Sequence, residues 1–170
     1  MRREVVSSVI AQHVEDAAIL HAIRSALASA PHVKLHHLRR FDDRIAAHCD
    51  GLRIAGEGAW PLCKMALELL SPGAIFTATL QAVQSKSLER LDRLLALAQS
   101  APDAACGLRA AFGWLEPDEL RGVVAALLAS DSPGAPRRRR SRAPRRAIVR
   151  WPGTSRGWAA GRWVQIFPIR

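Results

Sequence analysis

"SPGAIFTATLQAV", residues 71–83, contains the clearest helix start in the chain. Ser71 suits the N-cap position, where its hydroxyl accepts a hydrogen bond from the first turn. Pro72 suits the first helical position, because the backbone donor that proline lacks has no partner there. The pair predicts a helix over 72–85. A second proline, Pro102, opens the same kind of helix 30 residues further on.

Hydrophobic patterning predicts helices on both sides of this stretch. Apolar residues that recur at steps of three and four predict amphipathic helices over 4–29 and 35–55. Starts marked by proline or serine predict the others, over 59–70, 88–99, 102–114 and 117–129. No part of 1–130 shows the period-two alternation of a strand, so the predicted fold class is all-α. The residues predicted to point inward from 59 onward include Trp60, Cys63, Leu67, Leu70, Leu88, Leu91, Leu95 and Ala98.

The short helices imply that the fold depends on stacking. Helices of roughly 10–14 residues are marginal alone and need neighbours that bury their apolar faces. Antiparallel helix pairs at this spacing are typical of an α-solenoid. A small closed bundle is the alternative. The last predicted helix, 117–129, has a wide apolar face. We expect this face to be exposed, and to favour self-association, if no further pair covers it.

Charge divides the chain into two parts. The formal net charge is +10, yet residues 1–133 hold 14 basic and 15 acidic residues. Residues 134–170 hold 11 Arg, with no Lys, no acidic residue and no Leu. We therefore predict a helical domain over 1–132 and a disordered Arg/Pro/Gly-rich tail over 133–170.

Two explanations of the basic tail stay open. A GC-rich reading frame shifted by one base favours Arg, Pro, Gly, Ala and Trp codons, so the tail can be a frame-shift product. Alternatively it is a natural arm that binds nucleic acid, since clustered guanidinium groups bind phosphate without sequence preference and with steep salt dependence. The candidate nucleic-acid-binding residues on this second reading are Arg137, Arg138, Arg139, Arg140, Arg142, Arg145 and Arg146.

Three segments resemble the N-terminal part of a proteobacterial family of HEAT-repeat proteins: "LRRFDDRIAAHCDGLRIAGEGAW" at 38–60, "SPGAIFTATLQAV" at 71–83 and "GLRAAFGWLEPDELRGVVAALLAS" at 107–130. The most specific match runs from Leu38 to Gly56, and the resemblance covers about 1–132. The resemblance implies that the stacked helix pairs form a fragment of a HEAT-like or ARM-type α-solenoid. It also implies a truncated or frame-shifted member, because helical repeats continue in the longer family members where this chain departs after Ser132.

The histidines, the cysteines and the polar residues around Asp50 are predicted to have structural roles. Six histidines include a cluster at His32, His36 and His37, but no H-E-x-x-H motif or cysteine pair completes a metal site. We therefore predict histidines at the surface or at helix ends, and no metal or cofactor. Cys49, Cys63 and Cys106 are predicted to be reduced, buried thiols. In "HCDGL", at 48–52, we predict that Asp50 and Arg53 take part in a polar contact between helices.

These observations predict a non-catalytic helical scaffold or protein-interaction module. No nucleophile elbow, phosphate-binding loop or dinucleotide fingerprint supports an enzyme. The expected partner is another protein, bound through a helical surface. The alternative is a nucleic-acid-binding protein that acts through the Arg-rich arm. The sequence lacks an apolar run long enough for a membrane span and has no signal peptide, so a cytoplasmic protein is expected.

Overall fold

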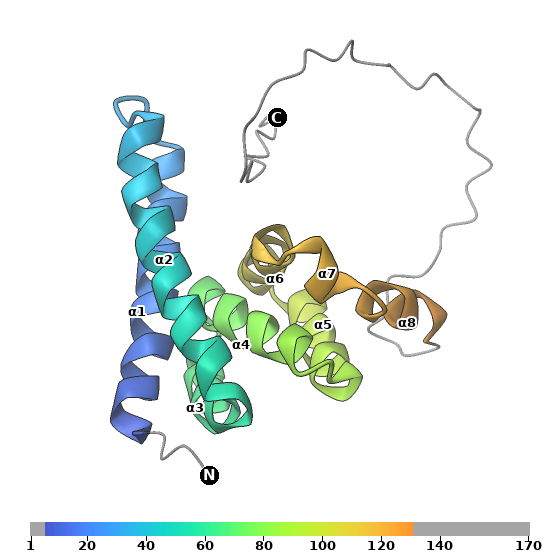
Figure 1. The fold of residues 1–170 in the computed structure, drawn as a ribbon. Coiled ribbons are helices and arrows are strands. Elements are labelled where there is room, and N and C mark those ends of the chain that lie inside the picture. Colours follow the sequence, from blue (N-terminus) through green and yellow to red (C-terminus); the bar gives the residue numbers. More distant parts are fainter. Residues whose placement is uncertain (1–5, 131–170) are drawn as a thin grey trace, which may run out of the picture. The chain divides into compact units, whose positions relative to one another are not determined.

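The computed structural model describes residues 6–130, and Figure 1 shows the helices of this unit in colour. In this range the regular elements are all helices, so the all-α fold class is confirmed there. No helix among them is both long enough and apolar enough to cross a membrane. The α-helices are α1 (Ser7–Ala28), α2 (Leu35–Ala55), α3 (Trp60–Ala66), α4 (Pro72–Gln84), α5 (Leu88–Ser100), α6 (Pro102–Trp114), α7 (Pro117–Leu120) and α8 (Val123–Ala129), and the 3₁₀ turns are η1 (Gly56–Ala59) and η2 (Leu67–Leu69).

The predicted capping residues start the helices as expected. The Ser71 hydroxyl accepts a hydrogen bond from the backbone N–H of Ala74 at 3.1 Å, and α4 begins with Pro72. The Ser87 hydroxyl accepts from the N–H of Arg90 at 3.4 Å, at the start of α5. These caps satisfy backbone donors that have no partner within the helix.

Helices α1 and α2 form an antiparallel hairpin, whose two members run side by side in Figure 1. Arg24 near the end of α1 donates to Asp42 near the start of α2 at 2.7 Å. Further down, His13 on α1 meets His48 on α2. The hairpin therefore keeps a steady register along its length, and its lower half packs against the rest of the unit.

Helix α4 is the centre of the fold. Every residue from Gly73 to Val83 is buried. A helix that is apolar on all sides belongs in the interior, and no charged residue lies between Glu68 and Lys86. Helices α1 and α6 pack against α4, as do α3 and α5. The buried hydroxyls of Thr77 and Thr79 donate to carbonyl groups one turn earlier in the same helix, so they need no outside partner.

Two glycines permit the close packing of α1, α4 and α6. A Cβ on Gly73 would lie 2.2 Å from the carbonyl oxygen of Ala18 on α1. A Cβ on Gly107 of α6 would lie 2.1 Å from the carbonyl oxygen of Pro72. No side chain fits at either position, so both contacts bring one backbone directly against another.

Two predicted helices are interrupted. The helix expected over 59–70 tightens into η2 and ends at Leu70, so the prediction that Leu70 points inward is wrong. The helix expected over 117–129 is two helices, because Arg121 is extended and Gly122 has a φ of 83°. Within the last of these, Val123 and Leu127 are buried whereas Val124 and Leu128 remain exposed. The predicted tail, 133–170, lies outside the described residues.

Candidate functional site

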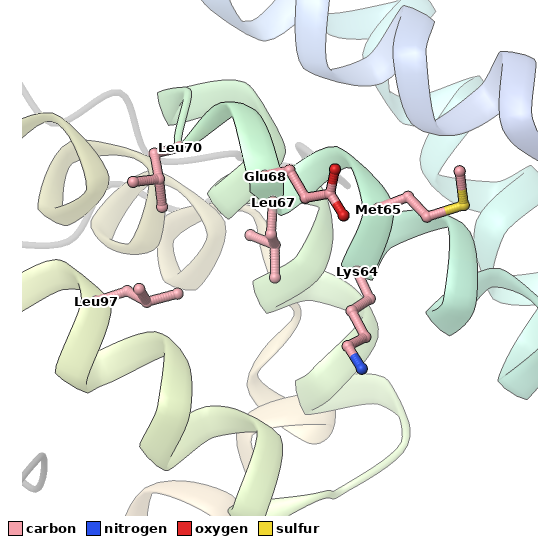
Figure 2. Close-up of a pocket in the computed structure, with 6 residues that line it drawn as sticks. All are labelled: Lys64, Met65, Leu67, Glu68, Leu70 and Leu97. Atoms are coloured by element: carbon pink, nitrogen blue, oxygen red, sulfur yellow. The ribbon is translucent and has the colours of Figure 1, made fainter.

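An open, mainly apolar depression lies where α3 and η2 face α5. It has a volume of about 520 Å³. Figure 2 shows Leu67 and Leu70 lying on one side, with Leu97 of α5 across from them. The complete lining is Lys64, Met65, Leu67, Glu68, Leu70 and Leu97.

The backbone at Leu70 gives the depression its apolar edge. Leu70 ends η2 in the left-handed conformation, with φ 46° and ψ 25°, immediately before the Ser71 cap of α4. This conformation costs a side-chain-bearing residue about 1–2 kcal/mol, and strained residues of this kind cluster at binding sites. Leu70 is 47% exposed here, and Leu69 just before it is 81% exposed. Two neighbouring leucines are thus presented to solvent.

Opposite charges flank this apolar surface. Lys64 and Glu68 are both exposed and are four residues apart, across the junction of α3 and η2. Within the part of the chain that the structure describes, neither of them forms an ion pair. Their charges are therefore available to a partner.

A network around Arg90 ties both walls of the depression together. The guanidinium of Arg90 on α5 donates to both carboxylate oxygens of Glu57 in η1, at 3.1 and 2.6 Å. It also stacks over the ring of Trp60 at the start of α3, with 4.4 Å to the ring centroid. The hydrogen bond from Arg90 lowers the pKa of Glu57. Bidentate pairing and stacking together fix the position of α5 relative to η1 and α3.

The polar residues of the "HCDGL" stretch, His48 and Asp50, both contact other side chains. Arg53 donates to Asp50 at 2.5 Å and to Glu119 of α7 at 3.1 Å. The predicted polar contact between helices is therefore confirmed. His48 contacts His13, and the backbone at Gly51 lies against the His13 ring.

The histidine prediction holds only in part. His32, His36 and His37 are exposed near the start of α2. His21 corrects the prediction, because it is 4% exposed and stacks on Phe76 with ring centroids 4.3 Å apart. Among residues 6–130 its Nδ1 has no hydrogen-bond partner, and burial, helped by the charge of Arg24, lowers the pKa of His21 to about 4. The ring is therefore neutral at pH 7. It lies in the core between α1 and α4.

Two of the three cysteines are buried as predicted. Cys49 and Cys63 lie in the core, where burial raises the pKa of the Cys63 thiol to about 12. Cys106 is exposed on α6, which corrects the prediction for that residue. Among the described residues, no group of three or more histidine, cysteine or carboxylate side chains could hold a metal ion.

The candidate nucleic-acid-binding residues, Arg137, Arg138, Arg139, Arg140, Arg142, Arg145 and Arg146, lie outside the described residues. Comparisons of the chain with protein-family models, with curated proteins and with solved structures find no match. Sequence reasoning missed the depression, because the helical stripe placed Leu67 and Leu70 on one inward face. The available signal was Ser71-Pro72, which starts a new helix directly after Leu70 and so forces the chain to turn there.

Proposed function

We propose that the helical body is a non-catalytic protein-interaction module that binds an amphipathic helix of another protein in the depression beside α3 and α5. The observation that carries this proposal is the exposed Leu70, whose left-handed backbone lies at the edge of the depression, directly after the exposed Leu69. Apolar grooves of this kind accept helices whose apolar residues recur at steps of three and four. Apolar side chains of the partner would lie against Leu67, Leu70 and Leu97.

Charge complementarity favours a helix of another protein as the occupant. Lys64 and Glu68 are four residues apart, and oppositely charged residues one turn apart on a partner helix would pair with both. Such rim contacts orient a partner more than they strengthen its binding. We therefore expect the partner helix to carry an acidic and a basic residue beside its apolar face.

We also propose that the helices form a HEAT-like stack of pairs. A HEAT-like stack of helix pairs is supported by the linear order in which α1, α4 and α6 pack, with the glycine contacts at Gly73 and Gly107 between successive helices. The exposed Val124 and Leu128 on α8 are the kind of surface that a following pair would cover. On this proposal the chain is the N-terminal part of a longer repeat array, in keeping with its resemblance to HEAT-repeat proteins.

Site-specific cross-linking tests the binding site. A photoreactive amino acid is placed at Leu69, and a matched control at Ile54, an exposed apolar residue of α2. We expect adducts in cells at Leu69 only, mapping by mass spectrometry to an amphipathic helical segment of another protein. Adducts to a second copy of this chain, or equal yields at both positions, would contradict the proposal.

A substitution separates binding from folding. Leu70→Asn removes an apolar contact, yet asparagine tolerates the left-handed conformation better than leucine. We expect the variant to be as stable as the parent or more so, by up to about 1 kcal/mol. We expect it to bind the cross-linked partner segment at least about tenfold more weakly, a loss of about 1.4 kcal/mol. Unchanged affinity would exclude Leu70 from the site.

The second candidate function is nucleic-acid binding by the tail, favoured by the 11 Arg and no acidic residue in 134–170. Replacing Arg137, Arg138, Arg139 and Arg140 with Gln in the full chain tests it. Affinity for a random-sequence RNA should fall, and the slope of log affinity against log salt should become shallower by up to about 0.7–0.9 for each phosphate that the variant no longer binds. An unchanged slope would argue against a role for these arginines.

A further inference from the structure

His13 and His48 meet inside the α1–α2 hairpin. Their Nδ1 atoms lie 3.0 Å apart, and the two rings meet edge to face with centroids 5.2 Å apart. A hydrogen bond between two imidazoles needs one nitrogen that carries a proton and one that offers a lone pair. The bond therefore survives when neither ring or only one ring is charged. When both rings are charged, both Nδ1 atoms carry protons and the bond is broken.

The backbone of α2 is shaped around this pair. Gly51 lies in the interior of α2, where glycine costs about 1 kcal/mol relative to alanine. A Cβ at this position would lie 2.6 Å from Nε2 of His13. In its observed position the His13 ring therefore occupies the space that a Cβ at Gly51 would fill. Both histidines are half-buried, so the rings are packed between the helices yet within reach of protons from solvent.

Charged groups near the pair have opposing effects on His48. A carboxylate oxygen of Asp16 on α1 lies 3.9 Å from His48 Nε2. Burial is the main influence and lowers the pKa of His48; Asp16 raises it, and His13 and Arg44 lower it. Among the other elements packed on α1, α4 carries no charged residue, η1 carries Glu57, which is held by Arg90, and α3 carries the exposed Lys64. Asp16 therefore supports one positive charge on the pair, and the second charge meets repulsion.

We propose that His13 and His48 form a proton-sensitive latch between α1 and α2. The latch is closed when at most one of the two rings is protonated. It opens when both are protonated, because the hydrogen bond is then broken. The two positively charged rings, still side by side between the packed helices, also repel each other. Opening loosens the contact of α1 with α2 as the pH falls.

Hydrogen–deuterium exchange of the full chain at pH 7.5 and pH 5, corrected for intrinsic exchange rates, tests the latch. Protection of the α1 amides between Ile10 and Ala17 should fall at least about tenfold at the lower pH, equivalent to one pKa unit of coupling. In His48→Asn the amide nitrogen takes the place of Nδ1 and cannot gain a second proton. The α1 amides of this variant should lose clearly less protection than those of the parent. The matched control, His36→Asn, alters an exposed histidine of the same helix and should keep the parental response.

A second variant and an NMR titration of the two histidine rings test the latch further. His13→Asn removes the other ring and should also blunt the loss of protection. Protonation of His21 destabilises all of these proteins alike, so its effect cancels in the comparison. The proposal is overturned if His48→Asn and His13→Asn respond to acid like the parent. It is also overturned if NMR shows both rings of the parent protonated while α1 keeps its protection, since the rings then separate without loosening the helices.

Discussion

The guanidinium of Arg53 on α2 lies 3.1 Å from a carboxylate oxygen of Glu119 on α7, across 66 residues of sequence. The same carboxylate oxygen lies 3.4 Å from Nε2 of Gln84 at the end of α4. Glu119 thereby connects three helices, and it also accepts a hydrogen bond from the backbone N–H of Glu116 at the start of α7. This four-residue helix is too short to be stable without such contacts.

Replacing Arg53 tests the connection. Arg53→Ala should lower the free energy of unfolding by less than about 1 kcal/mol, because the side chain is half exposed and water screens the pair. Denaturant titrations at low and high salt should show that the loss of stability shrinks as salt rises. Arg121→Ala is the control, since its ion pair with Asp118 lies within one turn and is more exposed. Equal effects of the two substitutions would show that the contact with Glu119 contributes nothing.

The close glycine contacts predict opposite effects of alanine within one helix. Gly107→Ala forces a methyl group against the Pro72 carbonyl and should destabilise the protein by about 1–3 kcal/mol. Gly113→Ala, near the end of the same helix, places its Cβ where no other part of the described chain, apart from its own turn of helix, lies within 4 Å. It should stabilise the protein by up to about 1 kcal/mol, because alanine is the better helix former. Thermal unfolding monitored by circular dichroism measures both, and a Gly107→Ala variant as stable as the parent would contradict the packing of α6 on α4.

The buried His21 predicts acid sensitivity of a defined sign. Burial holds its pKa at about 4 in the folded state, below the ordinary value of 6.5. The unfolded chain therefore binds the proton more readily, and stability is lost as pH falls from about 6.5 towards 4. The full loss is about 3 kcal/mol. Chemical denaturation of the parent and of His21→Leu across this range should give a shallower pH dependence for the variant. Parallel curves would show that His21 does not cause the loss.

The end of α4 predicts a stabilising substitution. Lys86 has a φ of 52°, and the N–H groups of Lys86 and Ser87 donate to Val83 and Ala82, as in a Schellman motif. Lys86→Gly should raise the free energy of unfolding by about 1 kcal/mol, because glycine adopts this conformation without strain. Denaturant titration measures the gain. A loss of stability would mean that the lysine side chain makes a contribution larger than the strain.

Helix positions were predictable because local chemistry marks them. Ser71, Pro72, Ser87 and Pro102 set helix starts that depend only on neighbouring backbone groups. Hydrophobic periodicity also located α1 and α2, although Val6, Ile23 and Leu35, which belong to the same apolar pattern, are exposed. In α5 the predicted inward face holds for Leu91, which is fully buried, and for Leu95 and Ala98, which pack partly buried against the core. Leu88 lies at the surface instead, and the buried Leu94 was not predicted.

Features set by tertiary packing were harder to predict. A search for single stripes assumes one buried face, so it did not recognise α4 as enclosed on every side. His21 lies beside the α1 stripe, and only the stacking of Phe76 against it shows that its ring is in the core. The pairing of His13 with His48 joins residues 35 positions apart, and no local pattern brings them together. The left-handed Leu70, which shapes the candidate site, depends on the meeting of η2 with α4.

The enclosure of α4 is the claim on which the glycine contacts, the histidine stacking and the position of the candidate site all depend. Native-state hydrogen exchange of the full chain, followed residue by residue, tests it most directly. The amides from Ile75 to Val83 should be the slowest to exchange, opening only with the free energy of global unfolding. If these amides exchange as fast as those of the peripheral helix α8, α4 is not the core of the protein and the fold described is wrong.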